Sequence, residues 1–434
     1  MTEPSLGPVL SHSAGICKFS PNGKFFALCS PGGRKNRIVI KSASDYTTAH
    51  IFSCVSTISQ IEWSPDSDYI LCGMNAKSIV QVFSIWNPKE FSCRLTEGVA
   101  GLTHTLWAPD SRQILTIADF QLHITIWNLA TNTQNVIKSP KLITQGIDFS
   151  TDERFLAVAH RKEAKDYIGI YAVHADWQRV KFFRVATTDL EAILWSPNDE
   201  CIVARDNCIE YLFLVYSPTG TLISRYQAYE RALGLKYCCW APNGCFFTAG
   251  SYDEVCRVFN TVTWKPMAEC EHDNKTIPTL LLQDKNHEKE NEDSGNAPSL
   301  PKTVKIVKPD LTKYNPRIGI GSIAWSSESE YFATRNDNMP HTVWIWSPTH
   351  RKPVAVLEFE TRVFSFKWDP ARPTLAIAIG TPVIAIWSKS EGARLIKVEQ
   401  NESDPVKGIR WNPNGGKIIL VSKENLYPMD CAFI

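Results

Sequence analysis

A degenerate five-residue motif recurs along the whole chain of 434 residues. It consists of an aromatic residue, Ser or Ala, Pro, Asp or Asn, and Gly or Ser. Its nine copies are FSPNG at 19, WSPDS at 63, WAPDS at 107, FSTDE at 149, WSPND at 195, WAPNG at 240, WSSES at 325, WDPAR at 368 and WNPNG at 411. Successive copies start 42 to 46 residues apart, except for one interval of 85 between the sixth and seventh. A repeat of this length indicates one continuous array rather than the roughly three domains suggested by length alone.

The chemistry of the motif predicts a tight turn between two short strands. Pro presets φ, Asp or Asn bonds its own backbone, and Gly tolerates a positive φ. Apolar runs such as KFFALCS (24–30) follow the turn, and third runs end in an aromatic residue, as in VWIWS (343–347). Weaker fourth runs include RVKFFRV (179–185). Four strands in each repeat predict an all-β WD-repeat β-propeller. One closed ring of nine four-stranded blades is preferred over two smaller rings, and eight blades are the alternative count.

The repeats depart from the usual WD pattern. The Asp of the WD dipeptide is replaced by Asn, Ser or another residue, and no blade carries a Gly-His dipeptide. We therefore expect the buried Trp–Ser/Thr–His–Asp network of such blades to be incomplete. Stability should instead come from stacked aromatic and aliphatic layers, to which most of the 14 Trp contribute as core residues.

The two chain ends and one insertion complete the predicted organisation, in which residues 1–434 form a single propeller. The segment 6–10 (LGPVL) is predicted to add a strand to the last blade and so close the ring. Residues 271–316 are predicted to be a flexible insertion between the sixth and seventh blades, because 284–293 (DKNHEKENED) is highly charged. The stretch 303–309 (TVKIVKP) is expected to add a strand or to dock a partner. The terminal CAFI fits a prenylation pattern, and the alternative is that it completes a strand that buries Cys431.

Composition excludes several classes of protein. Lys and Arg number 46 against 45 Asp and Glu, which argues against a protein that coats nucleic acid or an anionic membrane. No run of 18 apolar residues predicts a membrane span, and residues 1–10 lack the features of a secretory signal. The 13 Cys are scattered without paired CxxC spacing, as expected for a reduced cytosolic or nuclear protein.

Motifs of catalysis and cofactor binding are also missing. There is no GxSxG, P-loop or kinase signature. The segment 319–321 (GIG) formally begins a GxGxxA pattern but leads into a strand, whereas a dinucleotide site needs a helix there. We therefore predict no catalytic residue, no cofactor and no metal site.

Polar runs inside the repeats are the candidate binding residues, since loops at propeller faces usually bind peptides. The loop TRNDN is longer than a tight turn requires. The predicted protein-binding residues are Arg335, Asn336, Asp337, Asn338, Tyr229, Glu230, Tyr252 and Trp177. The alternative is that these side chains only satisfy the turns that contain them.

Several of these stretches also carry a family resemblance. They include NPRIGIG (315–321), YFATRNDNMPHTVWIW (331–346) and AYERALGLKYCCWAPNGCFFTAGSYDEVCRVFNTVTWK (228–265), and the TRNDN segment is the most specific element. The chain resembles the WD-repeat proteins encoded antisense to tumour protein 73, from about Ile16 to Val421 and including the insertion. The resemblance implies a centrosome and spindle-pole protein that works with a coiled-coil anchoring protein of the synovial-sarcoma X breakpoint-interacting type and with a minus-end-directed kinesin. It also implies roles in anchoring microtubule minus ends and in cilium assembly, without catalytic residues.

The sequence thus favours a non-enzymatic scaffold in the cytoplasm, at the microtubule-organising centre. The main alternative is an RNA-associated or translation-initiation-type propeller, because large divergent propellers with similar turns occur in initiation factors. That alternative needs a basic patch with exposed aromatic residues, and the near-neutral charge weighs against direct binding to nucleic acid. A propeller enzyme would need acid–base or metal groups that converge near the ring axis.

Overall fold

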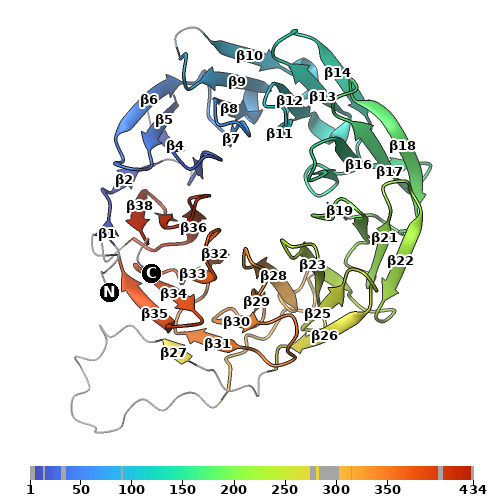
Figure 1. Cartoon of the computed structure of the whole chain (residues 1–434), viewed down its shortest axis with the longest axis vertical. Helices are drawn as coiled ribbons and strands as arrows, with labels where there is room; N and C mark the ends of the chain where they lie inside the picture. Colours follow the sequence, from blue (N-terminus) through green and yellow to red (C-terminus); the bar gives the residue numbers. More distant parts are fainter. Residues whose placement is uncertain are drawn as a thin grey trace.

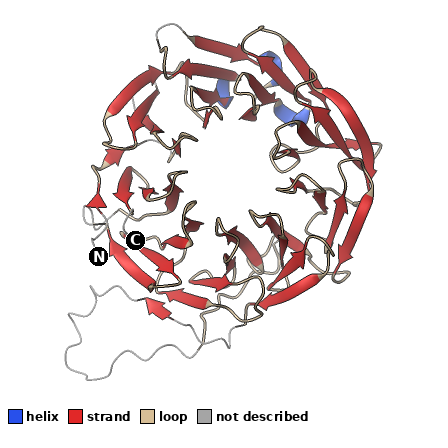
Figure 2. Ribbon diagram, in the orientation of Figure 1, coloured by secondary structure: helices blue, strands red, loops and turns tan. Residues whose placement is uncertain are grey.

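The computed structural model describes residues 5–12, 15–30, 36–88, 91–273, 280–282, 303–313, 315–398 and 404–431. It contains nine sheets arranged in a ring (Figures 1 and 2). The prediction of an all-β propeller with nine four-stranded blades is confirmed. Each blade runs outward from the ring axis in chain order, with its first strand innermost (Figure 1).

The strands of each blade follow one another from the innermost to the outermost. Blades 1 to 3 contain β3 (Cys17–Phe19), β4 (Phe25–Ser30), β5 (Arg37–Ser42) and β6 (Thr48–Ser53); β7 (Gln60–Trp63), β8 (Tyr69–Met74), β9 (Ile79–Ser84) and β10 (Ser92–Thr96); and β11 (His104–Trp107), β12 (Gln113–Ile117), β13 (His123–Asn128) and β14 (Gln134–Lys138). Blades 4 to 6 contain β15 (Ile147–Phe149), β16 (Phe155–Lys162), β17 (Lys165–Ala172) and β18 (Gln178–Val185); β19 (Ala192–Trp195), β20 (Ile202–Arg205), β21 (Leu212–Tyr216) and β22 (Leu222–Gln227); and β23 (Leu235–Trp240), β24 (Phe246–Ser251), β25 (Val255–Asn260) and β26 (Pro266–Glu271). Blades 7 to 9 contain β28 (Ile320–Trp325), β29 (Phe332–Asn336), β30 (Thr342–Trp346) and β31 (Ala355–Phe359); β32 (Ser365–Trp368), β33 (Thr374–Ala378), β34 (Val383–Ser388) and β35 (Gly392–Lys397); and β36 (Gly408–Trp411), β37 (Lys417–Val421) and β38 (Asn425–Asp430).

Helical structure in the described residues is limited to three short 3-10 turns, η1 (Asn75–Lys77), η2 (Gly98–Ala100) and η3 (Asp119–Gln121). No helix in this part of the chain has the length and apolar character needed to cross a membrane.

The repeated motif forms the turn between the first and second strands of each blade. Its fifth residue has a left-handed backbone in eight of the nine copies, with φ between +57° and +72°. This is why Gly, Ser and Asp are common at the position, since bulky residues are strained there. Ser64 shows how the motif seals its own turn. Its hydroxyl accepts the N–H of Tyr69 at 2.9 Å and donates to Asp66 Oδ1 at 2.5 Å.

The motif aromatic also ties each blade to the one before it. Trp63 Nε1 donates to the backbone oxygen of Lys18 at 3.0 Å, and Lys18 immediately precedes the aromatic of the previous copy. The equivalent hydrogen bond, from Trp Nε1 to a backbone oxygen of the previous blade, occurs in four further blades. It joins Trp107 to Glu62, Trp240 to Leu194, Trp368 to Ala324 and Trp411 to Lys367. The motif turns are linked as well, because the N–H of Asp66 donates to Ser111 Oγ of the next blade at 3.0 Å. These five tryptophans therefore act as inter-blade hydrogen-bond donors in addition to packing.

The two ends of the chain meet in blade 9 (Figure 1). The strands β1 (Ser5–Leu6) and β2 (Leu10–Ser11) both pair with β38 in antiparallel register. The predicted single strand 6–10 is thus two short strands separated by residues 7–9. Blade 9 also joins blade 1 at the motif turns, where Asn412 Nδ2 donates to the backbone oxygen of Gly23 at 2.8 Å.

The insertion adds to the outside of blade 7. A short strand, β27 (Leu280–Leu282), pairs in parallel with the outermost strand β31. The stretch 303–309 contains no strand. Instead Val304 is buried, and the N–H of Val307 donates to the backbone oxygen of Asn338 at 2.7 Å. The charged segment 284–293 lies outside the described residues.

At the other end of the chain, Cys431 is 3% exposed, and burial raises the pKa of its thiol to about 12. Residues 432–434 also lie outside the described part of the chain.

Candidate functional site

Seven of the eight predicted binding residues lie on one face of the ring. In an antiparallel blade, the loops after the second and fourth strands share one end, and the loops after the first and third share the other. We call the end that carries the loops after the second and fourth strands the upper face. Arg335, Asn336, Asp337 and Asn338 lie where β29 leads to β30, Tyr252 lies between β24 and β25, and Tyr229 and Glu230 lie between β22 and β23. Trp177 lies between β17 and β18 and so belongs to the opposite end.

Trp177 has a packing role in this structure. Its side chain is 5% exposed, and its Nε1 donates to Gln113 Oε1 of blade 3 at 2.8 Å. Its ring meets Phe149 edge-on with a centroid distance of 6.4 Å. A side chain this buried has little surface to offer a partner, so we leave Trp177 out of the candidate site.

Asn336 and Asn338 join blades 6 and 7. Asn336 is fully buried and Asn338 is 4% exposed. Both side-chain amides donate to Glu254 Oε2 on the loop of blade 6, at 2.7 and 3.0 Å. The two amides therefore hold the long loop against the neighbouring blade, which agrees with the alternative that Asn336 and Asn338 serve their own loop.

A buried chain of hydrogen bonds lies directly beneath this junction. Trp346 Nε1 donates to Thr334 Oγ1 at 2.8 Å, and Thr334 lies 2.6 Å from His272 Nε2. The opposite ring nitrogen of His272 lies 3.1 Å from the backbone oxygen of Glu254. Burial lowers the pKa of His272 to about 3, so its ring is neutral. Trp346, Thr334 and His272 therefore form three members of the Trp–Ser/Thr–His–Asp network in blade 7. A backbone oxygen takes the place of the Asp carboxylate, which agrees with the expectation of an incomplete network.

The repeat pattern did not reveal His272 because the insertion separates it from its partners. The residue lies 62 positions before Thr334, whereas a repeat spans 42 to 46. The sequence feature that could have identified His272 is its place directly after a fourth strand, where a typical WD blade has its Gly-His dipeptide. Blade 3 shows a variant of the same arrangement, in which Trp127 Nε1 donates to Thr116 Oγ1 at 2.8 Å and Thr116 donates to Glu97.

Arg335 and Asp337 form a partly exposed ionic group with Lys236. Lys236 Nζ lies 2.7 Å from Asp337 Oδ2, and Arg335 Nη2 lies 3.6 Å from Asp337 Oδ1. Arg335 Nη1 also donates to the backbone oxygen of Val363 at 2.9 Å. Burial lowers the pKa of Arg335, and Arg362 adds to this effect, while Asp337 opposes it.

Tyr252 continues this group toward blade 6. The Tyr252 ring lies under Lys236 Nζ at 4.8 Å, and its hydroxyl donates to Asn315 Oδ1 at 2.8 Å. The structure thus brings Arg335, Asp337 and Tyr252 together through Lys236, a residue that no sequence motif singled out.

Tyr229 and Glu230 border a separate recess in blade 5. Tyr229 packs edge-on against Tyr211 at 5.0 Å and donates its hydroxyl to the backbone oxygen of Leu233 at 2.7 Å. Glu230 is exposed and lines a pocket of about 830 Å³ together with Arg225 and Ile209. Ile209 is 54% exposed, so the recess combines an apolar side chain with charges of both signs.

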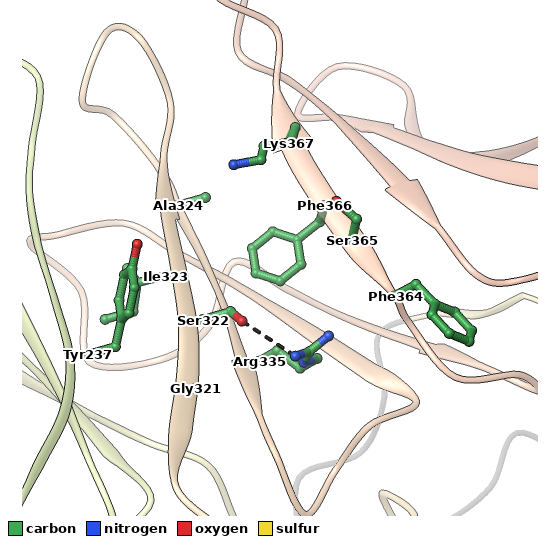
Figure 3. A pocket seen from close by; sticks show the side chains of 10 residues that line it. All are labelled: Tyr237, Gly321, Ser322, Ile323, Ala324, Arg335, Phe364, Ser365, Phe366 and Lys367. Carbon is green, nitrogen blue, oxygen red and sulfur yellow. Dashed lines mark hydrogen bonds between the residues drawn. The ribbon is translucent and has the colours of Figure 1, made fainter. Parts of the chain in front are cut away.

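A second pocket, of about 190 Å³, lies between the innermost strands of blades 7 and 8 (Figure 3). Phe366 and Lys367 line it from β32, Ile323 lines it from β28, and Arg335 closes it beneath Phe366 (Figure 3). Arg335 Nη2 reaches Ser322 Oγ at 3.4 Å, the dashed contact in Figure 3. Tyr237 and Phe364, at its margins, are 40% and 43% exposed.

Metal ligands do not converge in the part of the chain that the structure describes. Within it, no three or more His, Cys, Asp or Glu side chains are placed to hold an ion. The 13 cysteines all lie in the described ranges, where none of them forms a disulfide, and nine of them are buried.

Nine blades with a repeated Trp-containing motif define the class of the protein, which is the WD-repeat β-propellers. The family model "WD domain, G-beta repeat" matches residues 214–260. The fold is similar over 98% of both chains to the C-terminal WD40 domain of Sif2, with a TM-score of 0.55 and 10% identity.

Sequence relatives then give the particular family. The chain is 38% identical over 432 residues to "WD repeat-containing protein WRAP73" of Mus musculus. The matched region covers 94% of this chain and 92% of that protein. The chain therefore belongs to the WRAP73 family. It is also 22% identical over 209 residues to the serine-threonine kinase receptor-associated protein of Gallus gallus, covering 48% of this chain and 56% of that one.

Proposed function

We propose that the protein is a non-enzymatic adaptor at the centrosome or spindle pole. In this role it binds a coiled-coil anchoring protein of the synovial-sarcoma X breakpoint-interacting type and a minus-end-directed kinesin. It thereby organises microtubule minus ends, the spindle and the formation of cilia. The observation that carries the proposal is the 38% identity to WRAP73, which extends over 94% of the chain.

The geometry of the upper face supports an adaptor. A ring whose blades are tied through Trp donors and motif turns presents its loops at fixed positions, so little conformational entropy is lost when a partner binds. The blade 5 recess offers an exposed isoleucine beside Arg225 and Glu230. An apolar anchor with a polar rim is the arrangement that carries most binding energy in protein interfaces.

The proposal is tested by affinity purification with mass spectrometry alongside localisation of a fluorescent fusion in eukaryotic cells. We expect a centrosomal or spindle-pole focus and co-purification of a coiled-coil protein. A diffuse signal without such a focus, or RNA-binding proteins as the main co-purifying species, contradicts it.

The blade 5 recess can be tested in the same experiment. Glu230→Lys reverses an exposed charge at the recess, and we expect it to reduce co-purification of the anchoring protein. The matched control is Glu328→Lys, because Glu328 is exposed on the opposite face in blade 7. Equal losses from both variants exclude the recess as the specific surface.

A further inference from the structure

A group of cationic side chains gathers around the pocket of Figure 3. We call Arg335, Arg362, Lys367 and Lys407 the basic rim. Arg335 and Lys367 line the pocket itself. Arg362 Cζ and Lys407 Nζ lie 5.7 and 5.6 Å from the ring centroid of Phe364, which also lines it. Three blades contribute to the rim. Arg335 lies in blade 7, Lys367 lies in blade 8, and Lys407 lies in the loop that leads into blade 9.

Among the described residues, only one member of the basic rim lies close to a carboxylate. Asp337 is the acid that contacts Arg335, and Lys236 holds it at 2.7 Å. Arg362, Lys367 and Lys407 are exposed, and none of them forms an ion pair with a described residue. Like charges held together repel one another and reduce stability, while they attract an anionic ligand. This local excess is notable in a chain whose overall charge is only +1.

The setting of Phe364 favours carboxylates over nucleic-acid bases as the ligand. Proteins that bind single-stranded nucleic acid stack bases on free aromatic faces. Here cations already lie over the Phe364 ring at 5.7 and 5.6 Å, so the ring fixes the positions of Arg362 and Lys407. The N–H groups of both side chains can act as charge-assisted donors, and a guanidinium matches the geometry of a carboxylate.

The position of Phe364 depends on a glycine in the adjacent loop. A Cβ at Gly380 would lie 2.3 Å from the Phe364 ring. Gly380 also has φ of +69°, a backbone conformation that other residues rarely adopt. The exposed ring is therefore seated on the neighbouring loop at a defined place beside the pocket.

We propose that the basic rim binds an acidic, extended segment of a protein partner. Glu or Asp carboxylates of the segment contact Arg362, Lys367 and Lys407. One apolar side chain of the segment enters the pocket of about 190 Å³ against Phe366 and Ile323. The inference deepens the proposed adaptor function, because it names the chemistry of a partner segment and the place where it binds.

Direct binding is measured by fluorescence anisotropy with a labelled peptide in which glutamates flank a single leucine. The comparison peptide has glutamine in place of glutamate. We expect the full chain to bind the acidic peptide in a salt-sensitive manner and the glutamine peptide at least about tenfold more weakly. Equal binding of the two peptides, or no binding of the acidic one, overturns the inference.

Two pairs of substitutions place the site. The double variant Lys367→Glu with Lys407→Glu should bind the acidic peptide at least about tenfold more weakly than the wild type does. The matched control, Lys181→Glu with Lys265→Glu, makes the same charge change at exposed positions on the outer strand of blade 4 and on the opposite face. An equal loss in both double variants reports a general charge effect and overturns the assigned site.

A third variant separates binding from a structural role. The double variant Lys367→Met with Lys407→Met removes the like-charge repulsion. We therefore expect an equal or higher Tm together with loss of binding to the acidic peptide. A lower Tm with unchanged binding means that the rim is structural. Tighter binding of a single-stranded RNA than of the acidic peptide, lost in the same variants, assigns the site to nucleic acid instead. A chain that reaches the centrosome but does not bind the acidic peptide overturns this inference and leaves the adaptor proposal standing.

Discussion

Single tryptophans differ in what they contribute to the ring. Trp63 and Trp195 occupy the same motif position and are 4% and 5% exposed. Trp63 Nε1 donates to the backbone oxygen of Lys18 at 3.0 Å, whereas the buried Trp195 Nε1 has no hydrogen-bond partner among the described residues. In blade 5 the tie to the previous blade is made by the backbone N–H of Trp195, which donates to Asp148 Oδ2 at 2.7 Å. Burial raises the pKa of this Asp148 carboxyl to about 6.

These two residues form a matched pair for measuring the inter-blade bond. Both Trp63→Phe and Trp195→Phe remove similar packing, but only the first removes a satisfied hydrogen bond. We expect Trp63→Phe to be more destabilising by about 1 kcal/mol. Urea unfolding of both variants measures the difference, and equal midpoints would show that the bond contributes nothing.

His272 makes stability depend on pH. Its pKa is about 3 in the folded protein and 6.5 in the unfolded chain, so below pH 6.5 only the unfolded chain takes up the proton. Its contribution is fully present above pH 6.5 and is lost as the pH falls toward 3, by about 1.4 kcal/mol per unit. His272→Gln should flatten the dependence of Tm on pH between 6.5 and 5. His350→Gln, at an exposed position, is the control and should leave the slope as in the wild type.

At the scale of the element, the motif turn both ends a strand and joins two blades. Ser111 has φ of +57°, and its Oγ accepts the N–H of Asp66 from the preceding blade at 3.0 Å. Asp199 does the same with a carboxylate, which accepts the N–H groups of Thr151 and Asp152 at 2.6 and 2.8 Å. The fifth motif position therefore selects a small polar residue for its acceptor as well as for its backbone conformation.

Ser111→Ala tests this double role. The substitution keeps the backbone strain of the turn and removes the acceptor, so we expect a loss of about 1 kcal/mol in the free energy of unfolding. Ser111→Gly removes both, and relief of strain should make it the milder change. The prediction fails if the alanine variant unfolds at the same urea concentration as the wild type or if the glycine variant is the less stable.

At the scale of the molecule, stability depends on closing the ring. The contacts that close it come from residues 5–11 against β38 and from the blade 9 turn against the blade 1 turn. Deleting residues 1–12 removes the first set and exposes the edge of β38. We expect a lower Tm and a greater tendency to associate, measured by thermal unfolding and light scattering. Val9→Ser, at a 39% exposed position, is the control and should melt like the wild type; an unchanged Tm in the deletion would remove any role for these strands in closure.

Sequence by itself determined the all-β class and the place of every motif turn, and it favoured nine blades. It could do so because these depend on local rules, namely strand alternation and turn chemistry, repeated at a fixed spacing. It also marked the TRNDN loop as unusual in length. The sequence could not show which residues of this loop are buried, because Asn336 and Asn338 contact Glu254, a residue from another blade.

The tertiary structure alone decided which polar residues are exposed together. Trp177 and Tyr229 are both aromatic residues of polar loops, yet antiparallel topology places them at opposite ends of their blades. His272 joined Thr334 and Trp346 only because the ring brings the two sides of the insertion together. The basic rim likewise draws its charges from separate repeats, so it is invisible in any one repeat and in a net charge of +1. Repeat periodicity fixes local conformation, but the packing of one blade against the next determines which side chains meet.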